Sequence, residues 1–282
     1  MLRLGEKPVV LRVRLPPPVL ANTRTMFIRS MSPSPTWKAG QGVSEEQSSW
    51  RKAIDGPRKS WNLEEIPSTD VYKLLTSAIV PRPIALTSSL SPDGVLNLAP
   101  FSYFSMVSSN PPMLSISFSL SSRRKKDTRE NVLATKEFTV NIISQAFVEA
   151  ANITSVESSE ADEWVLSGLI YGTEYAGQAG TSERERILHG VRGALYSYQD
   201  ITPVGATEPT ATVVLGLIRY AHAMESVLDS DGTRVDPDKL QVVARMGGET
   251  YSKVVEGFDI ARPKWKDLNA VYLDLLGKKK DR

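Results

Sequence analysis

Residues 113–119 read Met-Leu-Ser-Ile-Ser-Phe-Ser, with apolar and hydroxyl side chains in unbroken alternation. Leu114, Ile116 and Phe118 fall on one face of an extended chain, and the serines fall on the other. This alternation predicts a half-buried β-strand. Residues 138–142, Phe-Thr-Val-Asn-Ile, repeat the pattern a short distance along the chain and predict a second such strand.

Other strand, turn and helix signals surround these two segments. Further strands are predicted at 84–87, 101–107, 192–200 and 211–223, and short helices at 68–78, 128–135, 145–153 and 160–167. Near-adjacent strands are joined by turn signals, as at Pro92-Asp93-Gly94, and not by alternating helices. The sequence therefore predicts a mainly β fold with peripheral helices, an antiparallel sheet or barrel and not repeated βαβ units. We predict that residues 171–190 form a long excursion from this sheet or barrel.

A basic stretch, Arg123-Arg124-Lys125-Lys126, precedes Asp127-Thr128-Arg129-Glu130, whose spacing is that of a capping box. A helix N-terminus with cations beside it is typical of a phosphate site. The alternative is a solvated basic loop before an ordinary cap. Because Asp127 as N-cap would compete with an anion for the first amides, we expect the side chains of Lys126 and Thr128 to be the better phosphate ligands.

Residues 97–104, Asn-Leu-Ala-Pro-Phe-Ser-Tyr-Phe, gather an amide, a proline, hydroxyls and aromatic rings. One interpretation is a ligand edge, where backbone groups and Ser102 contact a heterocycle lined by Tyr103 or Phe104. The other is the start of a strand whose aromatic side chains lie in the core. The pattern alone does not separate these two interpretations.

Composition excludes several kinds of site. The chain has no cysteine, which excludes disulfides, iron–sulfur clusters, thiolate zinc sites and thiol nucleophiles. Its two histidines, His189 and His222, exclude a multi-histidine metal site and leave few ways to build a Ser-His-Asp triad. The chain also lacks the glycine patterns of Rossmann and P-loop phosphate sites. We predict no metal site.

Charge and composition divide the chain into three predicted segments. Residues 1–60 are predicted to be an irregular, largely disordered arm, residues 61–265 the folded body, and residues 266–282 a C-terminal helix or tail. Residues 1–31 hold six basic groups and one acidic group, a charge of +5, which leaves −3 for the remainder of a chain whose net charge is +2. A weakly acidic body argues against nucleic-acid binding.

The Arg-rich start at residues 1–31 resembles an organelle transit peptide. The alternatives are an unstructured extension, or an upstream start that precedes Met26 or Met31. No apolar run approaches the ~20 residues of a membrane-spanning helix, so no membrane association is expected. We expect a cytoplasmic protein, or a mitochondrial one if the first segment is a transit peptide.

Taken together, the motifs between Tyr72 and about Pro263 resemble the flavin reductase-like family, whose fold is an FMN-binding split β-barrel. The matching segments keep the family's order and spacing over roughly two thirds of the chain. They are Pro81–Leu86, Asn97–Phe104, Ser109–Pro112, Lys126–Thr128 with Asn131, Phe138–Ile142, Asn152–Ser155, Gly216–His222 with Val227 and Leu228, Asp231-Gly232, and Arg245–Gly248 with Tyr251.

The resemblance implies a non-covalent FMN at a dimer interface and assigns residues to it. It places Thr87, Ser88 and Lys126-Asp127-Thr128, with Asn131, at the phosphate and ribityl chain. It places the ring edge at Asn97, Leu98, Ala99, Pro100 and Ser102, with Tyr103 beside them. His222 matches a family histidine and is a weak catalytic candidate, because a satisfied core or interface histidine explains it equally well.

The resemblance also implies a reaction, hydride transfer from NADH or NADPH to flavin N5 and from there to flavin or another small acceptor. It implies a homodimer and a partner monooxygenase. A non-catalytic FMN carrier or sensor is the alternative, and an oxidase of the pyridoxamine-phosphate type is a third reading. The chain departs from the family at Gly190–Tyr196, where a proline and an acidic residue are usual, so FMN binding is better supported than nicotinamide binding.

Overall fold

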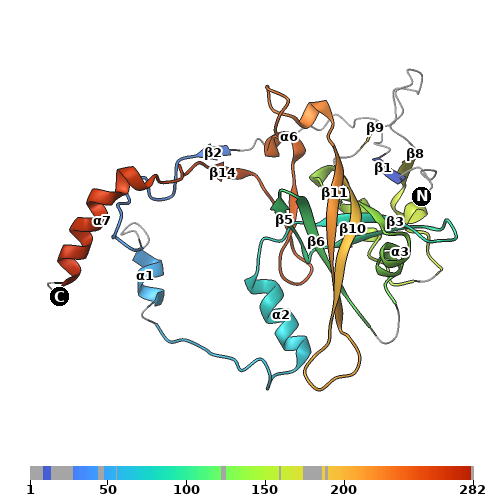
Figure 1. Cartoon of the computed structure of the whole chain (residues 1–282), viewed down its shortest axis with the longest axis horizontal. Helices are drawn as coiled ribbons and strands as arrows, with labels where there is room; N and C mark the ends of the chain where they lie inside the picture. The colour runs from blue at the N-terminus through green and yellow to red at the C-terminus, as the bar shows by residue number, and fades with distance from the viewer. Residues whose placement is uncertain are drawn as a thin grey trace. The chain divides into compact units, whose positions relative to one another are not determined.

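The computed structural model describes residues 9–13, 28–43, 48–54, 56–121, 125–158, 160–173, 186–187 and 190–280. The chain forms two compact units (Figure 1). The first comprises Met1–Thr25 with Tyr72–Val254, and the second comprises Met26–Val71 with Val255–Arg282. These units differ from the predicted arm, body and tail, because a segment of the arm groups with the end of the chain.

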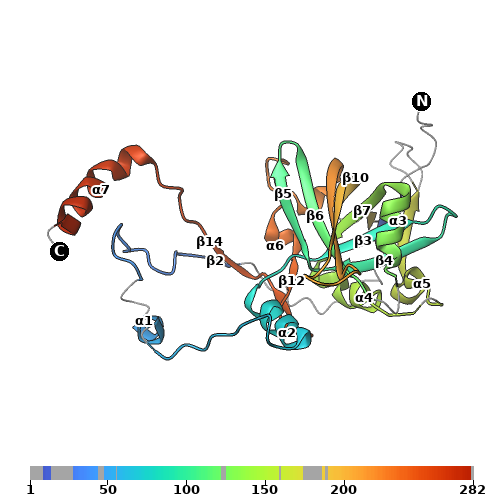
Figure 2. The ribbon, with the colours of Figure 1, turned by 60° about the horizontal axis from the view of Figure 1, so that its bottom comes forward.

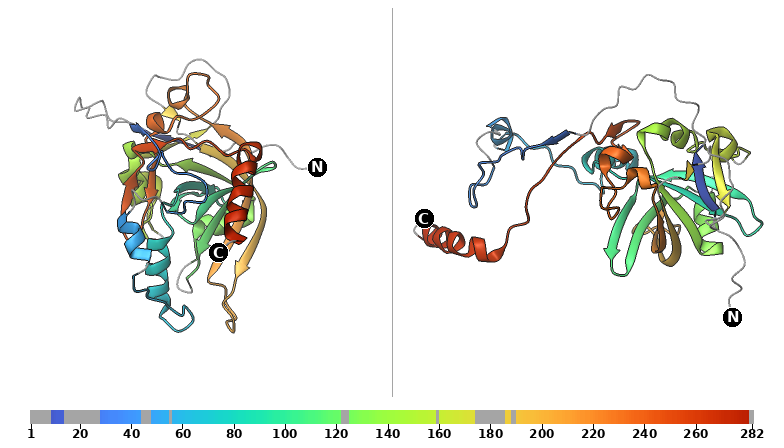
Figure 3. Two further views of the ribbon diagram at one scale, coloured as in Figure 1. Left: turned by 90° about the vertical axis from the view of Figure 1, so that its left-hand side faces the viewer. Right: turned by 90° about the horizontal axis from the view of Figure 1, so that it is seen from above.

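The first unit is built on a seven-stranded antiparallel sheet with the order β4-β3-β7-β10-β11-β6-β5. The predicted mainly β, antiparallel fold is confirmed. The long hairpin of β10 and β11, yellow to orange in Figure 3, lies in the middle of the strand order. The strands are β3 (Ala85–Leu90), β4 (Leu96–Phe101), β5 (Phe104–Ser109), β6 (Pro112–Ser119), β7 (Glu137–Ile142), β10 (Gly190–Ile201) and β11 (Ala211–His222).

The two edge strands of this sheet, β4 and β5, are neighbours in sequence, separated by Ser102 and Tyr103 alone. A two-residue connection between opposite edges requires the sheet to curl back on itself, as Figure 2 shows. An edge-to-face contact of Phe101 on β4 with Phe118 on β6 crosses the curl, and a bond of 2.8 Å from the Ser117 amide to the Tyr103 carbonyl extends the pairing of β5 with β6 up to the turn. The single strand predicted at 101–107 is therefore wrong, because the chain changes edges within it.

The core has two parts, one on each face of β3. Ala85 packs with Phe118, Val140 and their neighbours inside the curled sheet. Ile84 and Leu86, one residue away on either side, pack with Trp164 and others on the opposite face. β3 is therefore buried on both faces, while β6 keeps the predicted alternation, with Leu114, Ile116 and Phe118 buried and the serines more exposed.

Two glycines make room for Phe138 inside the sheet. A Cβ at Gly216 would lie 2.5 Å from Phe138 Cζ, and a Cβ at Gly193 would lie 2.8 Å from the same atom. Both distances are too short for any side chain to replace these hydrogens without movement. Gly193 belongs to the segment Gly190–Tyr196 that departs from the family pattern, so part of that departure serves the packing of β10 against β7.

Helices and smaller sheets surround the main sheet. Predicted helices are found as α2 (Ser68–Ala78), α3 (Asp127–Thr135), η2 (Gln145–Phe147) with α4 (Val148–Ile153), and α5 (Glu163–Ser167). The later elements are η3 (Glu225–Val227), α6 (Pro237–Leu240) and the paired strands β12 (Val243–Arg245) and β13 (Tyr251–Lys253). None of the helices in the described ranges is long and apolar enough to cross a membrane.

A small sheet of three strands includes residues from the predicted targeting segment. β1 (Val9–Val13) lies between β8 (Leu169–Thr173) and β9 (Arg186–Ile187), antiparallel to both. This pairing was not predicted. Most of the excursion expected at residues 171–190 lies outside the described residues, as do residues 1–8 and 14–27, so the targeting prediction stays a prediction.

The second unit joins the beginning and the end of the chain. β2 (Ile28–Ser30) pairs in parallel with β14 (Glu256–Phe258), and the unit adds the helices α1 (Ser48–Ile54) and α7 (Trp265–Lys280). Gly40 has a positive φ of 86°, and a Cβ there would lie 2.8 Å from the Leu275 side chain on α7. The described part of the predicted irregular arm thus contains ordered elements, which local periodicity did not reveal because their partners lie at the far end of the sequence.

Candidate functional site

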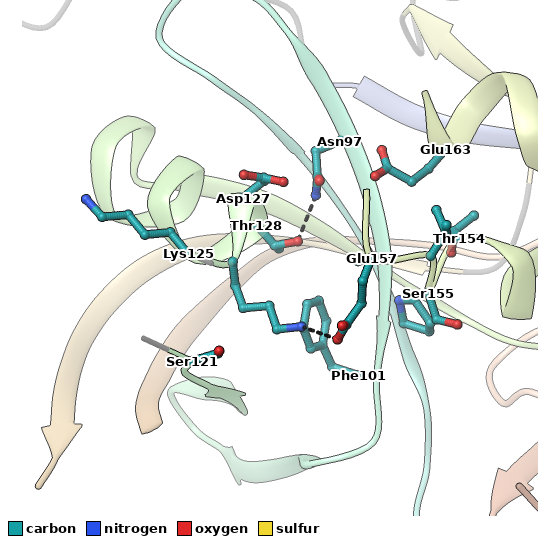
Figure 4. Close-up of a pocket in the computed structure, with 14 residues that line it drawn as sticks. Asn97, Phe101, Ser121, Lys125, Asp127, Thr128, Thr154, Ser155, Glu157 and Glu163 are labelled. Carbon is teal, nitrogen blue, oxygen red and sulfur yellow. Dashed lines mark hydrogen bonds and ion pairs between the residues drawn. The ribbon is translucent and has the colours of Figure 1, made fainter. Parts of the chain in front are cut away.

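A pocket of about 300 Å³ opens in the first unit, where β4, the start of α3 and the segment from α4 to α5 meet (Figure 4). Its lining combines an apolar floor with lysines, carboxylates, hydroxyls and an amide. The lining residues are Asn97, Ala99, Pro100, Phe101, Ser121, Lys125, Lys126, Asp127, Thr128, Thr154, Ser155, Val156, Glu157 and Glu163.

β4 supplies the floor and one polar group. Asn97, Ala99, Pro100 and Phe101 line the pocket, and the first three are among the residues that the resemblance assigns to the edge of the flavin ring. Leu98 does not, because neighbouring side chains on a strand point to opposite faces and Leu98 is fully buried in the core below. Side chains of residues 97–101 thus divide between the pocket surface and the core, and the ligand-edge interpretation stays a prediction.

A buried polar network fixes this side of the pocket. The Asn97 amide donates to Thr128 Oγ1 over 2.7 Å and to Ser89 Oγ over 3.4 Å, and the Asn131 amide donates to Ser89 Oγ over 3.1 Å. These four side chains are all at most 8% exposed and join β3, β4 and α3. Asn131, a predicted ligand, therefore lies behind the pocket surface and does not line the pocket. Ser89, which the sequence did not indicate, accepts hydrogen bonds from both Asn131 and Asn97.

The start of α3 differs from the predicted capping box. Lys126, and not Asp127, occupies the N-cap position, and its side chain makes no cap hydrogen bond. Asp127 is the first helical residue and is exposed at the pocket. Lys126 Nζ lies 3.6 Å from the Glu157 carboxylate, which belongs to the segment after α4. Arg123 and Arg124, the first half of the basic stretch, lie outside the described residues.

The opposite wall comes from the segment between α4 and α5, which sequence reasoning did not assign to the site. Thr154, Ser155, Val156 and Glu157 follow directly after α4. Thr154 and Ser155 stand in a segment that matched the family, which was the available signal for them. Glu157 and Glu163 had no signal beyond their charge.

Glu163 is the buried carboxyl group of this wall, 8% exposed at the start of α5. Asp162 before it caps the helix, with Oδ1 accepting from the amides of Trp164 at 2.9 Å and Val165 at 3.1 Å. The pKa of Glu163 is raised above its ordinary value. Burial is the main cause, backbone hydrogen bonds at Glu163 itself and at Leu98 oppose it, and the charges of Asp127 and Asp162 add to it.

Two predicted phosphate ligands on β3 are not part of the pocket lining. Thr87 is fully buried, and its Oγ1 finds no hydrogen-bond partner among the described residues. Ser88 is also buried and shares a hydrogen bond with the hydroxyl of Thr139. Both hydroxyls lie within the sheet, where β3 pairs with β4 and β7.

Ser102 and Tyr103 lie outside the pocket as well, at the connection between β4 and β5. Ser102 Oγ accepts a 3.5 Å hydrogen bond from Arg82 Nε. The same guanidinium, 9% exposed, donates to the carbonyls of Thr76, Ile79 and Met246 over 2.5–2.8 Å. Burial, and then the neighbouring Tyr72, raise the pKa of Tyr103, while Arg82 opposes them. Arg82 thus anchors the turn on which both predicted residues stand.

His222, the weak catalytic candidate, ends β11 opposite Gly190 and does not line the pocket. Among the described residues, no group of three or more acidic or histidine side chains is placed to hold a metal ion.

The donor set of the pocket fits a phosphate-bearing planar ligand. Lysine ammonium groups and the hydroxyls of Ser121, Thr128 and Ser155 are the groups that bind phosphate oxygens. Phe101, Pro100 and Val156 offer apolar surface beside them. The residues present are therefore consistent with a cofactor that has an anionic end and an apolar ring.

Comparison with known proteins gives a consistent result. The family model described as flavin reductase like domain matches residues 77–196. The Bacillus subtilis protein YwrF is 32% identical over 203 residues, which cover 71% of this chain and 97% of YwrF.

Solved structures show the same fold. Nitrilotriacetate monooxygenase component B from Bacillus cereus is 29% identical, with a TM-score of 0.62 over 73% of this chain and 100% of that chain. A Shewanella frigidimarina protein assigned as a flavin reductase with a split barrel domain has a TM-score of 0.55 and 19% identity over 73% of this chain and 99% of that one.

Proposed function

Since the chain belongs to the flavin reductase-like family and has its split-barrel fold, we propose that it is an FMN-dependent oxidoreductase that uses NADH or NADPH to reduce flavin or another small acceptor. The observation that carries the proposal is the pocket between β4 and α3. There Lys126 stands at the N-cap without a side-chain cap bond, beside Thr128 and Asn97.

Each part of the pocket has a proposed role. Lys126, Thr128 and Ser155 would hold the phosphate through charge-assisted and hydroxyl hydrogen bonds. Asn97 keeps Thr128 in place through the 2.7 Å bond between them. Ala99, Pro100 and Phe101 would border the ring and exclude water from that side. When bound, FMN would supply the hydride-accepting chemistry, so the protein's task is to bind, orient and shield.

The proposal extends to assembly. Similarity to nitrilotriacetate monooxygenase component B supports a partner monooxygenase that consumes the reduced flavin. We also propose a homodimer, as the family resemblance implies. Sedimentation should then give about twice the chain mass of 31.1 kDa. A monomer that keeps FMN tightly bound would contradict a cofactor site shared between subunits.

The decisive experiment is an anaerobic titration of the purified protein. It should be yellow, or become so with added FMN, and should release FMN and not FAD on denaturation. NADH or NADPH should then bleach the flavin bands under anaerobic conditions. Colourless protein that does not bind added FMN would refute the proposal. Bound FMN that neither nicotinamide bleaches would favour the non-catalytic carrier or sensor instead.

A further inference from the structure

Among the described residues, the charges that line the pocket oppose binding of the phosphate-bearing ligand that its other side chains fit. Two lysines, Lys125 and Lys126, line the described part of the pocket together with three carboxylates, Asp127, Glu157 and Glu163. A phosphate monoester carries about −1.5 to −2 near neutral pH. With all three carboxylates ionised, the lining would repel the group that its lysines attract.

The three carboxylates differ in their freedom to move away. Glu157 has an 82% exposed side chain and is held at 3.6 Å from Lys126 Nζ, so it can turn into solvent when a ligand phosphate replaces it. Asp127 is exposed at the rim, where water screens its charge. Glu163 is 8% exposed on a short helix fixed by the Asp162 cap and by the buried ring of Trp164.

Glu163 cannot turn away from a bound phosphate, so its repulsion of the phosphate falls when its carboxyl group is protonated and neutral. Asp162 on its own helix and Asp127 at the start of α3 are the charges that act on it, and Lys125, Lys126 and Glu157 are the other charged residues in the described lining of the pocket. β4 contributes the neutral Asn97 and a backbone hydrogen bond from Leu98. In Figure 4 the side chains of Asp127, Asn97 and Glu163 follow one another along one side of the pocket.

We propose that Glu163 takes up one proton from solvent when the pocket binds the phosphate of FMN, and so serves as a specificity-determining group for the charge of the ligand. This inference rests on the proposed function. The protonated carboxyl group is neutral and gains an O–H donor, so a repelling group becomes one that tolerates or binds the anion. The pKa of Glu163 is already raised in the free protein, which favours the same protonated form.

The inference fixes the sign of a pH dependence. If binding takes up a proton, affinity falls as pH rises above the range in which the free carboxyl group is protonated. Because binding is linked to protonation, uptake of one proton weakens FMN binding by at most tenfold for each pH unit. The second ionisation of the phosphate, at a pKa of about 6, acts in the opposite direction, so the measurement belongs between pH 6.5 and 8.5. Riboflavin lacks the phosphate and should bind without this dependence.

Calorimetric titration of the full chain with FMN tests the inference. At one pH, buffers of different ionisation enthalpy should give different heats that correspond to uptake of up to one proton. Glu163→Gln keeps the shape but cannot ionise, so it should show no uptake from this group and a flatter affinity profile. Glu157→Gln is the matched control and should keep the uptake.

The possible results of the titration distinguish the inference about Glu163 from the proposed function. Uptake in the wild type and in Glu157→Gln that is lost in Glu163→Gln supports the inference. FMN binding without uptake in the wild type overturns it and leaves the proposed function intact, and so does uptake that persists in Glu163→Gln. Absence of FMN binding in the wild type overturns both. If Glu163→Gln does not fold, Asp127→Asn takes its place: it removes a charge that raises the pKa of Glu163, so the uptake should move to lower pH, and an unchanged pH range overturns the inference.

Discussion

The two walls of the pocket are built in different ways. The wall of β4 and α3 is held from behind by Asn97, Thr128, Ser89 and Asn131, which connect three elements through buried hydrogen bonds. The hydrogen bonds at the surface of the wall between α4 and α5 are local, such as the Asp162 cap and the Ser155 hydroxyl bond of 2.7 Å to Asn152 O, while Trp164 beneath them is buried in the core. Substitutions at the polar side chains of the first wall should therefore affect the stability of the sheet, whereas substitutions at the exposed side chains of the second wall should change the fold little.

The largest effect is expected at Asn97, where binding and folding meet. Asn97→Ala removes the amide that donates to the buried hydroxyl of Thr128, while Ser89 keeps its bond from Asn131, and the loss should cost about 1–3 kcal/mol of unfolding free energy. Urea denaturation measures this change. Ser155→Ala, on the other wall, is the control and should change stability by less than about 0.5 kcal/mol because its hydroxyl is exposed. Equal losses at both sites would remove the distinction between the walls.

Lys126 should affect binding without affecting folding. A charge-assisted hydrogen bond contributes roughly 1.5–3 kcal/mol, so Lys126→Ala should weaken FMN by about tenfold or more, as fluorescence titration would show. Riboflavin binding should change much less. Lys125→Ala is the matched control, since its side chain is 83% exposed and lies 4.0 Å from Glu130, and it should weaken FMN by about threefold or less. Equal weakening of FMN and riboflavin would place Lys126 away from the phosphate.

Because of Glu163, the free energy of unfolding of the protein should fall as pH rises. Its pKa is raised in the folded protein, so the folded state binds the proton more tightly than the unfolded state does. Unfolding free energy then falls as pH rises from the unfolded pKa, about 4.3, through the folded one. Glu163→Gln lacks this dependence, so its thermal midpoint relative to the wild type should rise between pH 4 and 8. A constant difference over that range would show that the carboxyl group is ionised without penalty.

The smallest effect is expected at Glu157. Its pair with Lys126 is solvent-exposed, and such pairs contribute about 0.2–1 kcal/mol. Because the pair must open to admit a phosphate, Glu157→Gln should tighten FMN by roughly twofold to fivefold and leave the thermal midpoint unchanged. Weaker FMN binding in this variant would mean that Glu157 contacts the ligand favourably.

Sequence reasoning reached the first wall and not the second, for a physical reason. Asn97 stands at the start of a strand, and Lys126–Thr128 stand at the basic start of a helix. Both are local sequence patterns that can be recognised without knowledge of the fold. Thr154, Glu157 and Glu163 reach the pocket because α4 and α5 pack on the outer face of β3 and β4, a tertiary arrangement with no periodic signal. Thr87 and Ser88, also predicted as ligands, lie outside the pocket lining because β3 is buried on both faces.

The fold was predictable where one face of a strand is solvent-exposed, as in β6, whose alternation is plain in the sequence. It was less so in β7, where Asn141 is buried and Ile142 is half-buried, against the expected alternation. Asn141 lies between Leu86 O, to which its amide donates over 3.4 Å, and Gly190, where a Cβ would lie 2.8 Å from its Oδ1. The change of edge at Ser102 and Tyr103 was also hidden, because the run from Phe101 to Val107 is continuous in propensity.

The parallel pairing of β2 with β14 has a consequence for biosynthesis. β2 is synthesised before its partner at Glu256–Phe258, with the whole sequence of the curled sheet between them. At about 5–20 residues per second, β2 waits on the order of tens of seconds for its partner. The second unit can therefore assemble only after Glu256–Phe258 has been made, and a nascent chain that stalls before Glu256 carries an unpaired strand.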